Sequence, residues 1–133
     1  MATRLPNDYD TRREALATYF DSTARQAWID LTSDAKVSGI VGHLNSGTTI
    51  PASKIYSDAG IPQISPSATN PKYTRQGFKT TFRVVADDVH LGGTLGRYAV
   101  KDLKGKAIAV IDDRTAYGQG VAEEFEKAVK AAG

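Results

Sequence analysis

The chain has 133 residues, of which 41% are hydrophobic and 24% charged, the composition of an ordinary globular domain. Its 17 Lys and Arg residues and 15 Asp and Glu residues leave a net charge of +2. The charges are interspersed, so the chain offers no concentrated basic face for a nucleic acid. The absence of cysteine excludes disulfides, thiol catalysis and thiolate metal sites. We expect one soluble domain without nucleic-acid or membrane partners.

The start of the chain predicts no targeting segment. Met1 to Asp10 lacks the apolar core of a signal peptide. No apolar run approaches the ~20 residues of a membrane span. As written, the chain is expected to stay in the cytoplasm where it is made.

Residues 11–31 are expected to form an amphipathic helix. Thr11 and Glu14 have capping-box spacing. An apolar stripe then recurs at three- and four-residue intervals: Leu16, Tyr19, Phe20, Ala24, Ala27, Trp28 and Leu31. The stripe predicts a core-facing side rather than an aromatic ligand site.

Extended and helical segments alternate after Lys36. Strands are expected at residues 37–41, 61–64, 80–85 and 107–111, and Ala107–Ile111 is the strongest of them because its β-rich run suits burial on both faces. Helices are expected from Pro51 to Gly60, from a cap at Asp87 or Asp88 to Leu103, and after Gly118-Gln119-Gly120. This order predicts an α/β fold with a parallel sheet flanked by helices.

Three glycines interrupt the second of these helices. Gly92, Gly93 and Gly96 weaken it by roughly 1 kcal/mol each. They therefore mark either a hinge or close backbone packing.

Three polar segments follow expected strands, at the edge where open parallel sheets bind ligands. Asn45–Thr49 offers hydroxyls and backbone N–H groups at a helix start, which suits a carboxylate or phosphate. Ser65–Pro71 offers hydroxyls and carbonyls, and Asp112–Gly118 contains Tyr117, whose ring could cover an apolar ligand. Each segment alone also fits a self-capping loop, a turn or a surface aromatic, so both interpretations remain open.

The chemistry of an enzyme is not predicted. His43 and His90 lack metal-ligand spacing, and His43 at a strand end is expected to be a hydrogen-bonded core histidine. No Gly-x-Ser-x-Gly nucleophile elbow is present. We expect no catalytic residue, cofactor or metal.

Three motifs lie in the same segments: residues 41–53 (VGHLNSGTTIPAS), 60–71 (GIPQISPSATNP) and 108–120 (IAVIDDRTAYGQG). In this order they resemble leucine/isoleucine/valine-binding proteins of bacterial ABC importers. The resemblance implies part of a type I periplasmic-binding-protein fold, which is flavodoxin-like. In that family two α/β lobes close over a branched-chain amino acid in the periplasm and deliver it to the membrane components of the importer.

The resemblance also implies a set of ligand-binding residues. Ser46 and Thr69 would grip the amino acid through hydroxyls, and Ser67 and Ala68 mainly through backbone groups. Tyr117 would come from the facing lobe and help to enclose the ligand. The acidic group that meets the ammonium is expected in the part of the family sequence that this chain lacks.

The first 39 residues differ from that pattern. Residues 9–28 (YDTRREALATYFDSTARQAW) and 31–38 (LTSDAKVS) resemble the N-terminal helix of magnesium-protoporphyrin methyltransferases. No segment downstream resembles a glycine-rich S-adenosylmethionine loop, so methyl transfer is not implied. The expected organisation is a chimera: a helical segment at 1–39, part of lobe one at about 40–85, and the start of lobe two at about 86–133.

These observations lead to one expectation and two alternatives. We expect a piece of a branched-chain amino-acid-binding protein that binds ligand weakly or not at all and self-associates into a homo-oligomer through open sheet edges. One alternative is a functional binder completed by dimerisation. The other, remote alternative is a fragment of a tetrapyrrole methyltransferase.

Overall fold

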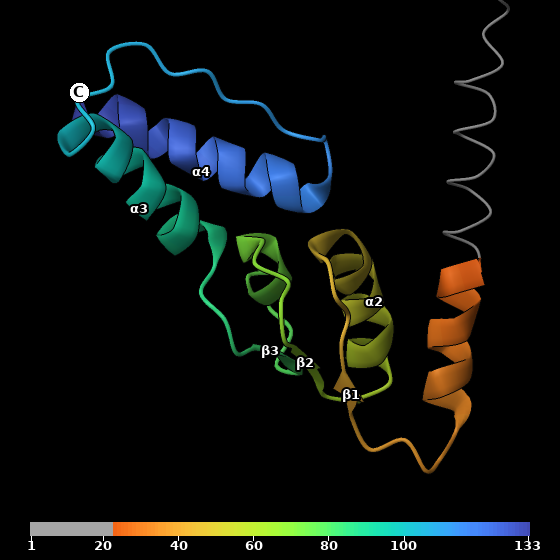
Figure 1. The fold of residues 1–133 in the computed structure, drawn as a ribbon. Coiled ribbons are helices and arrows are strands. Elements are labelled where there is room, and N and C mark those ends of the chain that lie inside the picture. Colours follow the sequence, from red (N-terminus) through yellow and green to blue (C-terminus); the bar gives the residue numbers. More distant parts are fainter. Residues whose placement is uncertain (1–22) are drawn as a thin grey trace, which may run out of the picture.

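The computed structural model describes residues 23–133. A helix covers residues 23–33, and the elements after it are β1 (Ile40–Val41), α2 (Ser46–Asp58), β2 (Gln63–Ser65), the 3-10 helix η1 (Pro71–Thr74), β3 (Thr81–Arg83), α3 (Asp88–Lys101) and α4 (Ala116–Ala132). Strands and helices alternate up to α3, so the expected α/β class is confirmed (Figure 1). Among the described helices, none combines the length and hydrophobicity needed to cross a membrane.

The three strands form a parallel sheet in the order β1-β2-β3. Val41 pairs with Ile64, and Ile64 pairs with Phe82. The carboxyl ends of the strands therefore meet at one edge, from which the loops to α2, η1 and α3 leave. α2 and η1 pack together on one side of this sheet, close to β2 and β3 (Figure 1).

The main apolar core lies between the helix at 23–33 and α2. Trp28 packs with Ala52, Tyr56 and Ile61. The prediction that the N-terminal helix buries an apolar stripe is confirmed for Trp28, whereas Leu31 is 39% exposed. The part of the predicted helix before residue 23 lies outside the described residues.

α2 begins five residues earlier than predicted. The expected start was Pro51, but the helix begins at Ser46 because the Asn45 side chain caps it by accepting from the Thr48 N–H at 3.0 Å. Pro51 lies inside the helix, where its φ is compatible and only one backbone hydrogen bond is lost. The predicted stop is confirmed, since Gly60 follows the cap with φ +72°.

α3 and α4 form a closely packed pair whose axes run in the same direction (Figure 1). The predicted cap of α3 is Asp87, whose side chain accepts from the His90 N–H. Two of the three glycines in α3 face α4: a Cβ on Gly92 would lie 2.6 Å from the Val121 carbonyl oxygen. The corresponding atom on Gly96 would lie 2.6 Å from the Phe125 carbonyl oxygen. Both glycines therefore serve close backbone packing.

The strongest strand prediction is wrong. Ala107–Ile111 lies outside the described sheet and is exposed along its length, with Ile111 at 93%. A strand needs a neighbour to pair its backbone groups, and no backbone group of residues 106–111 hydrogen-bonds to another backbone group in the described part of the chain. High β-propensity alone therefore leaves this run unpaired.

The close packing of α3 on α4 predicts opposite effects for two neighbouring glycines. Gly96→Ala should destabilise the chain by about 1–3 kcal/mol, because its Cβ would also lie 2.8 Å from the Ala128 Cβ. Gly93→Ala is the matched control: it meets only the flexible end of Arg97, at 3.3 Å, and should stabilise the helix by up to about 1 kcal/mol. Urea unfolding followed by circular dichroism tests both variants. Equal stability of the two would contradict the packing argument.

Candidate ligand-binding site

Two polar loops meet at the carboxyl edge of the sheet. Ser46, the first residue of α2, is fully buried, and its hydroxyl accepts a hydrogen bond from the Asn70 N–H at 3.2 Å. This contact links the loop after β1 to the loop after β2. The structure therefore brings Ser46 to the Ser67–Thr69 segment, although more than twenty residues separate them in the chain.

The loop after β2 is shaped by two serine hydroxyls. Ser65 donates to the His43 carbonyl at 3.0 Å and accepts from the Ala68 N–H at 2.9 Å. The Ser67 hydroxyl donates to the Leu44 carbonyl. Both hydroxyls therefore hold the loop against the segment that precedes α2, and the predicted ligand-binding residue Ser67 has a structural partner.

Arg83, at the end of β3, fixes the other side of the loop. Its Nη1 donates to the carbonyls of Ala68 (3.1 Å) and Asn70 (3.0 Å), and its Nη2 donates to the Thr74 hydroxyl at 2.9 Å. Ala68 is 1% exposed, and its N–H and carbonyl are both paired within the chain. In this structure both backbone groups of Ala68 therefore help to shape the loop.

Thr69 and Asp88 present buried polar atoms without partners. The Thr69 carbonyl accepts from the Asp88 N–H at 2.9 Å, which places the start of α3 beside the loop. Within the described residues, neither the Thr69 hydroxyl nor either Asp88 carboxylate oxygen has a hydrogen-bond partner of acceptable geometry. Burial raises the pKa of the Asp88 carboxyl, an effect that the nearby Thr69 hydroxyl and the Arg83 charge partly offset.

Asp88 was missed as a site residue at the sequence level. An acidic residue in the first turn of a helix is typically explained by the helix dipole, so the sequence predicts only a helix cap at Asp87 or Asp88. The available signal was position: Asp88 follows the third strand at the edge where the other two polar loops lie.

An open cavity of about 550 Å³ lies beside these loops. The residues lining it include Ser46, Gly47 and Asn70 from the sheet edge, and Ala116 and Gly120 from the start of α4. The Asn70 amide donates to the Ala116 carbonyl at 2.7 Å. Gly120 lies directly against the Asp88 carboxylate, where a Cβ would clash. The start of α4 therefore closes over the buried carboxylate.

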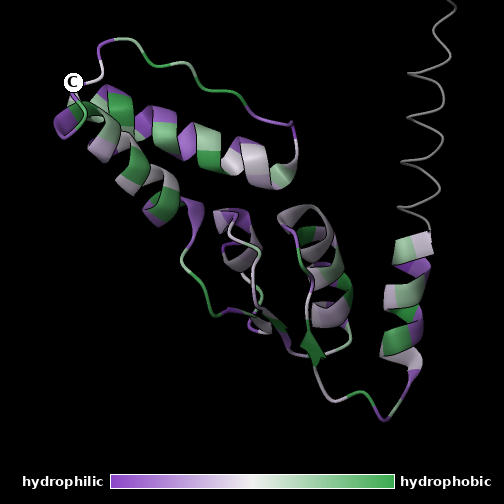
Figure 2. Ribbon diagram, viewed as in Figure 1, coloured by the Kyte–Doolittle hydropathy of each residue, from purple (hydrophilic) through white to green (hydrophobic). Residues whose placement is uncertain are grey.

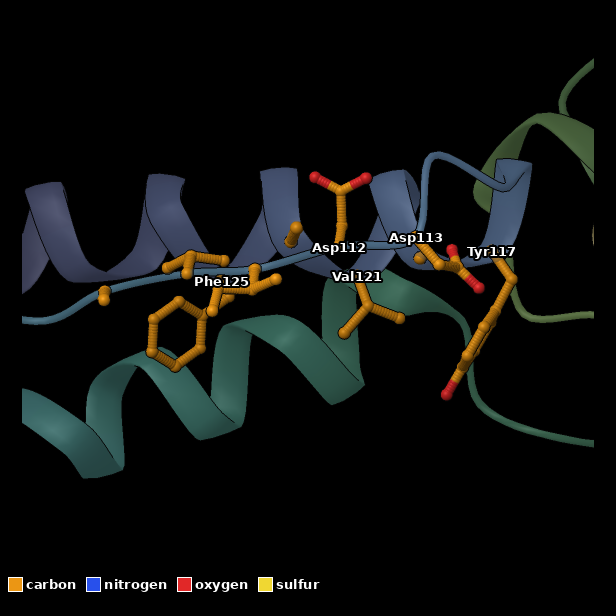
Figure 3. Close-up of a pocket in the computed structure, with 10 residues that line it drawn as sticks. Asp112, Asp113, Tyr117, Val121 and Phe125 are labelled. Atoms are coloured by element: carbon orange, nitrogen blue, oxygen red, sulfur yellow. The ribbon is translucent and has the colours of Figure 1, made fainter. Parts of the chain in front are cut away.

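Tyr117 lies in a different hollow. It is 44% exposed and lines a groove between α4 and the preceding chain segment, with Asp113, Val121 and Phe125 (Figure 3). The structure thus brings together four of the five predicted site residues, and Tyr117 contributes no wall to the cavity at Ser46.

His43 has a structural role, as predicted. Its Nε2 lies 3.1 Å from the Tyr56 hydroxyl, and its ring packs near Trp28 and Tyr56. Burial lowers the pKa of His43, which favours the neutral ring. Among the residues that the structure describes, no group of three His, Cys, Asp or Glu could hold a metal ion.

Sequence comparison places this architecture in a known group. Residues 20–133 match the family model "Periplasmic binding protein". The chain is 50% identical over 91 residues to Leu/Ile/Val-binding protein homolog 1 of Brucella abortus, covering 68% of this chain and 24% of that protein. It is 42% identical over 97 residues to the leucine-, isoleucine-, valine-, threonine- and alanine-binding protein of Pseudomonas aeruginosa, covering 73% of this chain and 26% of that protein.

Solved structures agree with the sequence matches. The leucine-binding protein LivK of Thermotoga maritima superposes with a TM-score of 0.77 at 27% identity, covering 84% of this chain and 32% of that one. The substrate-binding protein LivJ of Streptococcus pneumoniae, in complex with isoleucine, gives a TM-score of 0.71 at 30% identity, covering 80% and 31%.

The parallel sheet with polar loops at its carboxyl edge is that of a solute-binding protein. The chain belongs to the periplasmic binding protein family and is related to its branched-chain amino-acid binders. Members of this group bind solutes and are not enzymes, so the expectation of a non-enzyme is confirmed. The chain spans about a quarter of the length of these curated relatives.

The unpartnered Asp88 carboxylate predicts a pH effect on stability. Its pKa is higher in the folded chain than in the unfolded chain, so stability should fall as pH rises from the unfolded value through the folded one. Asp88→Asn should remove this fall and stabilise the chain at neutral pH by about 1 kcal/mol. Urea unfolding in acid and at neutral pH measures the difference.

Asp87→Asn is the matched control. Burial opposes ionisation here too, but hydrogen bonds from His90 and the charges of Arg83 and His90 hold the pKa of Asp87 below its ordinary value. Asp87 therefore adds stability above its unfolded pKa, and the neutral variant should gain nothing at neutral pH. A larger loss for Asp88→Asn than for Asp87→Asn at neutral pH would contradict this account.

Proposed function

We propose that this chain carries one half of a binding site for a branched-chain amino acid and binds that ligand weakly. The observation that carries the proposal is the pair of buried groups without a hydrogen bond of good geometry, the Thr69 hydroxyl and the Asp88 carboxylate, in and next to the loop that Ser46 contacts at Asn70. Buried polar atoms in native folds normally have partners, and those at a ligand site find them in the ligand. The names of the relatives support a branched-chain amino acid as that ligand.

The two charged groups of an amino acid fit different parts of the site. The amino end of α2 has no acidic residue in its first turn, and Ser46 and Gly47 line the cavity there, which favours the ligand carboxylate. The Thr69 hydroxyl and the Asp88 carboxylate suit the ammonium group as acceptors. Because Gly120 lies against Asp88, full contact with the ammonium requires the start of α4 to shift.

Weak binding follows from how little of the ligand this half-site covers. Tight small-molecule sites bury most of the ligand surface. Here the cavity is open, and Tyr117 lines another groove and adds no apolar cover. A second wall, supplied by another copy of the chain, would raise the affinity; this is the dimer-completed alternative.

The remaining parts of the proposal concern the cellular role. We assign this chain to the branched-chain amino-acid-binding proteins that act in the periplasm and deliver the amino acid to the membrane components of an ABC importer. Self-association is the second consequence, because Val41, Ile64 and Phe82 form a row of apolar side chains that are 84%, 40% and 50% exposed. Figure 2 shows the hydrophobic colouring of β1 in this row.

Titration of the ¹⁵N-labelled chain with leucine, followed by amide chemical shifts, tests the binding site. Leucine should shift the amides of Ser46, Gly47 and Thr69 with a millimolar or weaker dissociation constant. Leucinamide, which lacks the carboxylate, and N-acetyl-leucine, which lacks the ammonium, should bind more weakly. No shift up to the solubility limit of leucine would contradict the proposed function.

Thr69→Val separates binding from folding. The Thr69 hydroxyl lies next to Asp88 without a hydrogen bond of good geometry, so its removal should change stability by less than about 1 kcal/mol while leucine affinity falls by about tenfold. Thr94→Val, the same change at an exposed position of α3, should leave affinity unchanged. An equal effect of the two variants on leucine binding would contradict a role for Thr69.

A further inference from the structure

The run Ala107–Ile111 exposes both apolar side chains and unpaired backbone groups, which suits pairing with another strand. Ile108, Val110 and Ile111 are 37%, 45% and 93% exposed. The residues at either end of the surrounding segment, Lys104 and Arg114, have left-handed φ values of 55° and 59°. Figure 2 shows the segment as a hydrophobic stretch between hydrophilic ends. Such a stretch with free backbone groups is a template for strand pairing.

The charges beside this run suit pairing with a second copy of the same segment. Lys106 precedes it and Asp112 follows it, so the run has a positive start and a negative end. A partner strand that also has a positive start and a negative end places opposite charges next to each other at both ends when it pairs antiparallel. The segment itself meets this requirement, because a second copy turned by a two-fold axis presents its negative end to the positive end of the first.

We propose that two copies of this chain associate through residues 106–112, which pair as antiparallel strands centred on Ala109. In this register Lys106 faces Asp112 of the second copy, and Ile108 faces Val110 of the second copy. Both pairs occur twice because the interface is isologous, which closes the assembly at a dimer. The inference rests on the self-association proposed above and is independent of ligand binding.

The groove beneath the run allows this arrangement. The segment runs along α4, and Val121 and Phe125 of that helix line the groove beside it, so its side toward α4 is partly covered while the other side is open (Figure 3). The backbone edges of residues 106–111 make no backbone hydrogen bond in the described part of the chain, which leaves their N–H and carbonyl groups for the second copy. Pairing would therefore satisfy polar groups as well as bury Ile108 and Val110.

The edge of β3 in the same molecule has the same charge polarity and is the alternative partner. Lys79 precedes β3 and Asp87 follows it. An antiparallel strand at that edge would place Asp112 beside Lys79, so the two pairings predict different compensating substitutions.

A charge-reversal cycle tests the proposed pairing, with the dimer dissociation constant measured by sedimentation equilibrium without ligand. Lys106→Glu or Asp112→Lys alone sets like charges against each other at both ends and should raise the dissociation constant by about tenfold or more. The double variant restores both attractions and should return the constant to near its original value. Lys36→Glu, an exposed charge change outside the segment, should have little effect.

Two outcomes overturn the inference in distinguishable ways. A monomer at all concentrations, from micromolar to millimolar, would remove both the strand pairing and the self-association proposed above. A dimer that ignores the single reversals, or in which Lys79→Glu rather than Lys106→Glu rescues Asp112→Lys, would remove the pairing and leave self-association standing. Circular dichroism of each variant confirms that these exposed substitutions leave the chain folded.

Discussion

The hydrogen bonds of Arg83 hold the candidate site in shape. Ala68 and Asn70 lie in the loop after β2, where no neighbouring strand pairs with their carbonyls. A buried carbonyl without a hydrogen-bond donor lowers the stability of the fold. The guanidinium group at the end of β3 supplies donors for both carbonyls. With the loop fixed in this way, the Thr69 carbonyl can cap the start of α3, and the Thr69 hydroxyl is held next to Asp88. One cation therefore connects β3, the binding loop and α3.

The sequence predicts helix caps and turns well, because interactions between residues close together in the chain determine them. Asp87 caps α3, and Gly60 follows the end of α2, because a cap or a left-handed turn depends on few neighbours. Ala107–Ile111 failed as a strand because pairing depends on a neighbour that propensity does not reveal. The start of α2 was misplaced because the Asn45 side chain, rather than Pro51, determines it.

The same division applies to the site. Ser46 and the Ser67–Thr69 loop were predictable because parallel strands bring their carboxyl ends to one edge. Asp88 was not, since an acid in the first turn of a helix has a sufficient local explanation. Tyr117 depends on how α4 lies on the sheet, which is a tertiary property. Topology thus predicts which loops meet at the sheet edge, whereas the positions of Asp88 and Tyr117 depend on packing.

Binding and association have a common physical origin in this chain. The site offers polar groups to a ligand on one side only, and the sheet and the 106–112 segment leave apolar and backbone groups uncovered. The most direct test of the central claim is a crystal structure of the chain grown with saturating leucine. The account predicts leucine density between Ser46 and Thr69, with the ammonium toward Asp88. Leucine bound instead in the groove beside Tyr117, with the Ser46 cavity empty, would contradict it.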